Sequence, residues 1–144
     1  MATFDAAPLA AVLLGETGGL ASGRMLADPG HAICAVNAAE VVDTVSRARG
    51  RPARMVASAF QLWTEAGLRV VPLDWSRAAR AAELRSTHYH RTRCPVSLAD
   101  CGAIALAEQL GMELVTSDAP MIRLARELGI DVVPVPDSSG RTPK

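Results

Sequence analysis

Four acidic side chains share one placement, because each lies at or just past the end of a short apolar run that is typical of a strand. They are Asp5, Glu40, Asp100 and Asp118. The carboxyl ends of parallel strands meet at one edge of a sheet, so we expect these acids to converge. At a spacing of about 5 Å and an effective dielectric of about 20, each ionised pair repels by roughly 3 kcal/mol. The cluster therefore needs bound protons or a cation, and a divalent metal site is the natural hypothesis.

Each acid also has a purely structural interpretation as a helix cap. Asp5 and Asp118 stand where a helix N-cap is expected, and the segments 37–40 and 97–100 have the spacing of a capping box. Asp74 indicates that this chain also caps a helix at a strand end without an acid network. Capping is the better interpretation of each acid taken singly, and only the four together favour a metal site.

Other enzyme classes that place an aspartate after the first strand do not fit this sequence. A haloacid-dehalogenase-type phosphatase needs a second aspartate two residues on, where Ala7 stands. A response-regulator receiver needs a lysine at a later strand end, and Lys144 is the only lysine in the chain. Neither a G-x-x-x-x-G-K phosphate loop nor a G-x-S-x-G nucleophile elbow occurs.

Composition indicates one ordinary globular domain. The chain has 144 residues, 49% of them hydrophobic, and a formal net charge of zero, so a strongly basic nucleic-acid module does not follow from composition. The three cysteines lack C-x-x-C spacing and no stretch has the roughly 20 apolar residues of a membrane helix, so we expect a cytoplasmic protein with reduced thiols. We predict a domain over residues 1–135 and a flexible tail over 136–144, which is rich in serine, glycine and proline.

Strands alternate with helices along the whole domain, which predicts a three-layer α/β/α sandwich around a mostly parallel sheet of about five strands. The apolar runs predict strands at 3–4, 31–36, 69–73, 113–116 and 131–135. Helical patterns cover 8–14, 20–26, 37–49, 52–67, 74–86, 97–110 and 118–128.

Four short motifs, in order along the chain, carry a family resemblance. They are Phe4-Asp5-Ala6, Val36-Asn37-Ala38-Ala39-Glu40-Val41, Ser97-Leu98-Ala99-Asp100-Cys101 and Val115-Thr116-Ser117-Asp118. In order, spacing and total length they resemble a PIN-domain ribonuclease, above all the toxin of VapBC toxin-antitoxin systems. The resemblance runs from the first residues to about Val135.

The resemblance implies an endoribonuclease that depends on Mg²⁺ or Mn²⁺. The four acids would hold the metal and its water, with Asp5, Asp100 and Asp118 as the metal ligands and Glu40 completing the catalytic set. It also implies a five-stranded parallel sheet, a cognate antitoxin that blocks the site, and a toxin homodimer. Magnesium suits an open, acid-rich cleft, because it keeps several waters and takes few carboxylates.

Other residues near the acids have supporting interpretations. The hydroxyls of Thr116 and Ser117 can position a carboxylate or phosphate, or simply form a turn. Arg85, Arg91 and Arg93 precede the helix of Asp100 and can hold RNA phosphates at the cleft rim, the alternative being a solvated loop. One departure weakens the resemblance: toxins of this type commonly carry a small hydroxyl residue two positions after the first aspartate, where this chain has Ala7.

Partner binding has its own candidate surface. An apolar groove for an antitoxin helix can be formed by residues near the first two helices, although core packing is an alternative for most of them: Leu9, Val12, Leu13, Leu20 and Met25. Two rival functions stay open. One is a PIN-like protein-interaction domain with weak or no catalysis, and the other is a metal-dependent phosphatase or DNase that uses the same acidic cleft.

Overall fold

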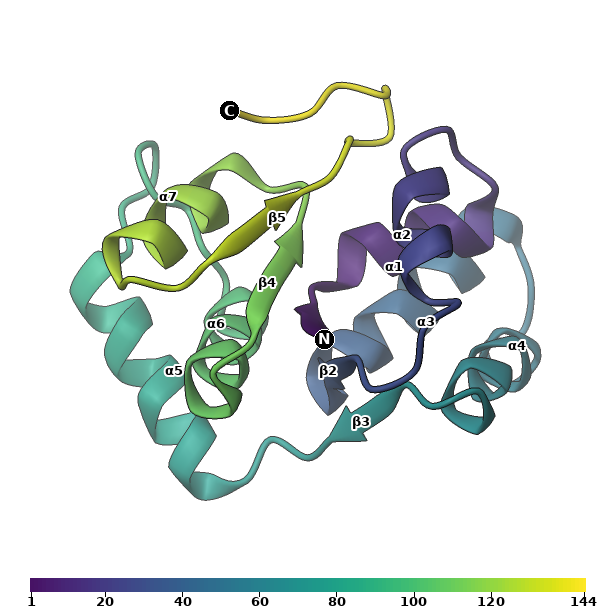
Figure 1. Cartoon of the computed structure of the whole chain (residues 1–144), viewed down its shortest axis with the longest axis horizontal. Helices are drawn as coiled ribbons and strands as arrows, with labels where there is room; N and C mark the ends of the chain where they lie inside the picture. Colours follow the sequence, from purple (N-terminus) through teal and green to yellow (C-terminus); the bar gives the residue numbers. More distant parts are fainter.

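The structure, a computed structural model, describes residues 1–144 and contains five strands and seven helices (Figure 1). The strands are β1 (Ala2–Phe4), β2 (Ala32–Cys34), β3 (Arg69–Val71), β4 (Glu113–Thr116) and β5 (Val132–Pro134). The helices are α1 (Ala6–Leu14), α2 (Gly19–Met25), α3 (Ala35–Arg49), α4 (Ala53–Glu65), α5 (Trp75–His88), α6 (Leu98–Leu110) and α7 (Ala119–Glu127). The predicted α/β fold class is confirmed.

All five strands are parallel, in the order β3-β2-β1-β4-β5. The central strand β1 pairs with β2 and β4, so Phe4 is in register with Ile33 on one side and Val115 on the other. Because the three strands run in the same direction, the residues that follow them emerge at one edge of the sheet. This register brings the ends of β1, β2 and β4 together.

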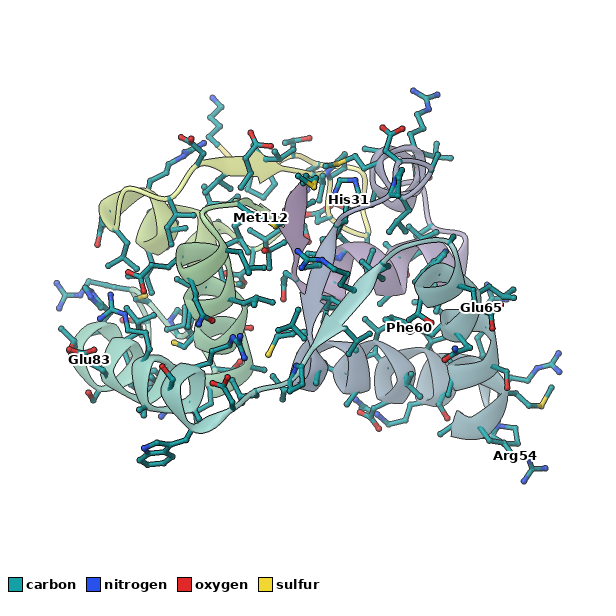
Figure 2. All side chains as sticks on the ribbon, turned by 60° about the horizontal axis from the view of Figure 1, so that its bottom comes forward. His31, Arg54, Phe60, Glu65, Glu83 and Met112 are labelled. Atoms are coloured by element: carbon teal, nitrogen blue, oxygen red, sulfur yellow. The ribbon has the colours of Figure 1, made fainter.

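The sheet separates two groups of helices. Successive strand residues point to opposite faces, so Phe4 and Ile33 join a core with α1, α3 and α4, while Leu114 joins a core with α5, α6 and α7. Figure 1 shows these helix groups on the two sides of the strands, and Figure 2 shows Phe60 of α4 within the first group and Arg54 extending away from it. These layers are the predicted α/β/α sandwich.

Several predicted boundaries differ from the structure: α1 begins at Ala6 rather than Pro8, β3 ends at Val71 rather than Leu73, and the boundary between β2 and α3 is shifted. The second strand was expected to reach Val36 and the next helix to begin at Asn37, but β2 ends at Cys34 and α3 begins at Ala35. Both Ala35 and Val36 are apolar, so the sequence shows no break at which the strand must end. Glu40 consequently lies in the second turn of α3 rather than in a capping box, and the N-cap Cys34 makes no side-chain cap hydrogen bond.

The first two helices cross closely, and this crossing requires glycine. A Cβ atom at Gly19 would lie 2.6 Å from the carbonyl carbon of Ala11, well inside van der Waals contact. The packing also buries Leu9 completely, with 0% of its surface exposed. Leu9 was predicted as a candidate for the antitoxin groove and is instead a core residue.

The C-terminal segment turns back over the strand ends (Figure 1). Asp137 closes this turn, because its Oδ1 accepts hydrogen bonds from the backbone N–H groups of Ser139 and Arg141. No helix of the molecule is both long and apolar enough to span a bilayer.

Candidate metal centre

Asp5 is the most deeply placed of the four acids. It follows β1 directly, caps α1 by accepting a hydrogen bond from the backbone N–H of Ala6, and is only 4% exposed. Two further donors reach it from distant elements. Thr116 Oγ1 donates to Asp5 Oδ2 at 3.0 Å, and Asn37 Nδ2 lies 3.4 Å from Asp5 Oδ1. The carboxylate is therefore oriented by α1, α3 and β4 together.

Asp100 and Asp118 each use one oxygen for a helix cap and leave the other without a partner. Asp100 forms the capping box of α6 with Ser97: its Oδ2 accepts from the Ser97 N–H at 2.7 Å, and its N–H donates to Ser97 Oγ. Asp118 caps α7 through Oδ1, which accepts from the Met121 N–H at 2.7 Å. Capping and metal binding are therefore compatible here, because they use different oxygens of the same carboxylate.

The four acids form one electrostatic group centred on Asp100. Burial, followed by the negative charge of Asp100, raises the pKa of Asp5 to about 7. Desolvation and then the Asp100 charge also raise the pKa of Glu40, although the residue as a whole is exposed. Burial raises the pKa of Asp118, and the Asp100 charge adds to this rise. The negative charge of Asp100 thus helps to raise the pKa of all three other acids, which are distant from it in sequence.

The two predicted hydroxyl residues differ in what they contact. Thr116 is fully buried and links two of the acids, because its Oγ1 donates to Asp5 and accepts from the Asp118 N–H at 3.1 Å. Ser117 makes no hydrogen bond to an acid. It lines a neighbouring hollow of about 290 Å³ together with Ala7 and Thr44.

The donor chemistry fits a largely hydrated magnesium or manganese ion. No three His, Cys, Asp or Glu side chains are grouped closely enough to hold a metal ion by themselves. A cage is not what Mg²⁺ requires, since one or two carboxylates, several waters and substrate phosphate commonly hold it. The unpartnered oxygens Asp100 Oδ1 and Asp118 Oδ2 are available to such an ion, and a cation would offset the burial and the Asp100 charge that together raise the pKa of Asp5.

The three arginines predicted to contact RNA have different surroundings. Arg85 is half-buried: its Nε donates to the Val96 carbonyl and its guanidinium stacks over the Tyr89 ring at 4.5 Å. Arg91 and Arg93 are exposed on the loop before α6, and neither forms an ion pair. Arg85 therefore supports the loop, whereas Arg91 and Arg93 remain available to a ligand.

A further arginine was missed by sequence analysis. Arg123 of α7 counteracts the rise in the pKa of Asp118, and it donates a hydrogen bond to the Arg93 carbonyl at 3.1 Å. Arg93 and Arg123 line a hollow of about 290 Å³ with His88, His90, Cys94, Pro120, Leu124 and Glu127. Arg123 has no motif around it, so only the packing of α7 against the loop indicates its position.

Comparison with known proteins agrees with this architecture. The family model described as the PIN domain matches residues 3–127. This chain belongs to the PIN-domain family. The match spans β1 to the end of α7, so the PIN domain includes all four acids and the arginine-lined hollow. A comparison with curated protein sequences found no significant match.

Several solved structures share the PIN-domain fold at low sequence identity. A chain of a toxin-antitoxin complex from Klebsiella pneumoniae is 17% identical, with a TM-score of 0.64, and the match covers 85% of this chain and 90% of that one. A chain of VapBC2 from Rickettsia felis, bound to a DNA fragment from its promoter, is 16% identical, with a TM-score of 0.63. The match covers 92% of this chain and 98% of that one. FitAcB from Neisseria gonorrhoeae is 21% identical, with a TM-score of 0.56, and the match covers 92% of this chain and 96% of that one.

Proposed function

We propose that this PIN domain is a divalent-metal-dependent endoribonuclease and the toxin of a toxin-antitoxin pair. The observation that carries the proposal is that the charge of Asp100 helps to raise the pKa of each of the other three acids, while Asp100 and Asp118 each keep a carboxylate oxygen without a hydrogen-bond partner. Membership of the PIN-domain family and the likeness to toxin-antitoxin structures support it.

The acids and arginines have complementary tasks in this reaction. A bound Mg²⁺ or Mn²⁺ ion lowers the pKa of a water and stabilises negative charge on the scissile phosphate. Asp5 provides a carboxylate held rigid by donors from three elements, and Asp100 and Asp118 each offer an oxygen that capping does not use. We assign to Glu40, exposed in the second turn of α3, the role of accepting a proton from the attacking water.

Replacing Asp100 with asparagine tests this function. Asparagine keeps one acceptor oxygen, which is enough for the hydrogen bond from the Ser97 N–H, but it removes the negative charge from the cleft. We expect RNA cleavage with Mg²⁺ or Mn²⁺ to fall by at least about 100-fold while the melting temperature is kept. Asp74→Asn is the control, because Asp74 also bonds the first turn of a helix, as the N-cap of α5, but its charge is not among those that raise the pKa of Asp5, Glu40 or Asp118. Asp74 also forms an ion pair with Arg77, so this control includes the loss of one surface ion pair.

The substrate assay separates this function from its rivals. RNA, single-stranded DNA and a phosphomonoester should be offered side by side to the metal-loaded protein, and we expect cleavage of RNA alone. Preferred cleavage of DNA or of the phosphomonoester would instead favour the DNase or phosphatase alternative. Equal RNA cleavage by the parent and by Asp100→Asn would contradict the proposed mechanism.

An antitoxin is the partner that we propose for the α1 and α2 face. Leu20 is 65% exposed and, with Val12, lines a hollow of about 510 Å³, while Leu13 and Met55 line a second apolar hollow of about 200 Å³. The second hollow lies between α1 and the α3–α4 pair, because Val45, Val56 and Ala59 also line it. Apolar hollows along packed helices suit the apolar face of a partner helix. Of the five groove residues proposed from sequence, Val12, Leu13 and Leu20 line these hollows, whereas Leu9 is buried and Met25 packs against the core.

A further inference from the structure

Asn37 presents a buried polar atom with no partner at the acid cluster. Its side chain is 0% exposed, and its Oδ1 accepts no hydrogen bond, while its Nδ2 lies 3.4 Å from Asp5 Oδ1. A buried acceptor without a donor costs about 1–3 kcal/mol, so each such group in a folded protein calls for an explanation. The position is also an unusual one for asparagine, because it lies early in α3 between core residues.

Turning the amide over does not resolve the problem. In the reversed orientation the amide oxygen would face the Asp5 carboxylate, and the NH₂ group would take the place that has no partner. The protein alone therefore satisfies Asn37 in neither orientation. The missing partner is a hydrogen-bond donor next to Asp5, and water bound to a divalent cation is such a donor.

We propose that Asn37 is an uncharged member of the metal site, whose Oδ1 accepts a hydrogen bond from water on the ion held by the acids. The proposal rests on the proposed function, because it assumes that Asp5 contributes to metal binding. It also explains why an amide stands here rather than a fifth acid: the amide supplies an oxygen without adding to the repulsion among the four carboxylates.

Two substitutions of similar size separate the role of the oxygen from the role of the NH₂ group. Asn37→Leu removes both, and Asn37→Asp keeps Oδ1 while it loses the donor to Asp5. Ser22→Ala is the control, because Ser22 Oγ is the other buried hydroxyl or amide oxygen without a partner, and it lies on α2, outside the acid cluster. The measurement is calorimetric titration of Mn²⁺ into metal-free protein, with thermal melting in the presence and absence of Mn²⁺.

We expect Asn37→Leu to bind Mn²⁺ about 10- to 100-fold more weakly, with an unchanged or higher melting temperature when no metal is present, since the unpaired oxygen is gone. Asn37→Asp should retain Mn²⁺ binding, but it should melt lower without the metal because it adds a charge. Ser22→Ala should bind Mn²⁺ as the parent does.

Different results overturn different claims. Parental Mn²⁺ affinity in Asn37→Leu would overturn the role of Asn37 alone. Weakened binding in both Asn37→Leu and Asn37→Asp would show that only the NH₂ group matters, through its hold on Asp5, and would also overturn the proposal. If the parent protein bound neither Mn²⁺ nor Mg²⁺, the proposed function would fail and this inference would fail with it.

Discussion

Asp5, Asp100 and Asp118 show how one residue can serve both fold and function. Each carboxylate caps a helix through one oxygen, which a metal does not need. The two interpretations that the sequence leaves open are therefore not exclusive. The structural role explains why these acids can be held rigidly, since an N-cap fixes the carboxylate relative to the first turn of its helix.

Asp5 should make the metal-free protein sensitive to pH. Burial, with the charge of Asp100, raises its pKa from 3.8 to about 7, so the folded state keeps a proton that the unfolded chain releases near pH 4. The stabilising contribution of Asp5 is fully present below about pH 4 and is lost as the pH rises to about 7. At a little over 1 kcal/mol per pKa unit, this loss is at most about 4 kcal/mol.

Asp5→Asn should remove that loss, because the amide does not titrate. Denaturant unfolding in EDTA between pH 4 and 8 should show the variant gaining stability relative to the parent as the pH rises, and added Mn²⁺ should stabilise only the parent. A stability difference that does not change with pH would show that Asp5 has an ordinary pKa.

Ala7 is a position at which activity should be open to improvement. It is exposed, two residues after Asp5, and faces the hollow that Ser117 and Thr44 also line, so a hydroxyl can be added without steric conflict. We expect Ala7→Ser to raise kcat/KM for RNA by up to about tenfold, through a hydrogen bond to the metal site, with little change in melting temperature. Ala53→Ser, exposed at the start of α4, is the control; a gain of equal size there would mean that the hydroxyl acts by another route.

Two elements that are far apart in sequence form the arginine-lined hollow. The loop before α6 carries Arg93, and α7 carries Arg123, which donates to the Arg93 carbonyl. The salt bridges of the molecule involve other arginines, so these two guanidinium groups are free to bind phosphates. The elements therefore act as a pair, in which α7 supports the loop and both contribute charge.

Arg93→Gln and Arg123→Gln should each weaken RNA binding and reduce its dependence on salt. Loss of one phosphate contact lowers the slope of log K against log salt concentration by about 0.7 for a single strand. Fluorescence anisotropy with labelled RNA, in the Asp100→Asn background to prevent cleavage, measures both quantities. Arg126→Gln is the matched control, because Arg126 is exposed on the same helix but does not line the hollow; an equal effect there would indicate only general charge attraction.

The molecule as a whole has two functional surfaces. Asp5 and Asp118 lie at the carboxyl edge of the sheet, directly after β1 and close to the end of β4, while Leu13 and Leu20 of the first two helices line hollows that we propose for a partner. Helix α1 connects them, since it begins at Ala6, directly after Asp5, and ends at Leu14. A partner bound along α1 would therefore lie close to the cleft.

Leu20→Glu should weaken antitoxin binding without unfolding the protein, because the side chain is already 65% exposed. Co-expression with the product of the adjacent gene, the expected antitoxin, should then fail to relieve growth inhibition, and co-purification should be reduced. Leu62→Glu is a close control, since Leu62 is 63% exposed on α4 and lines neither hollow. If both variants bind the antitoxin as the parent does, the partner uses another face.

The sequence alone determined the alternation of strands and helices, the caps at Asp5, Asp74 and Asp118, and the placement of Asp5 and Asp118 just after strands. These features depend on local rules: the two-residue period of a strand, the periodicity of a helix and the capping preference of aspartate. The expectation that Asp100 also follows a strand was wrong, because α6 comes after α5 and a loop, with no strand between them. Some boundaries were missed, and the one between β2 and α3 falls in an uninterrupted apolar run in which no local signal marks the change.

Only the tertiary structure decided which side chains meet. The order β3-β2-β1-β4-β5 places Thr116 against Asp5 across 111 residues of sequence and brings Asn37 to the same carboxylate. The same packing buries Leu9 and joins Arg123 to the loop of Arg93. Such contacts follow from strand order and helix packing, which depend on the burial of apolar surface over the whole chain rather than on any short segment.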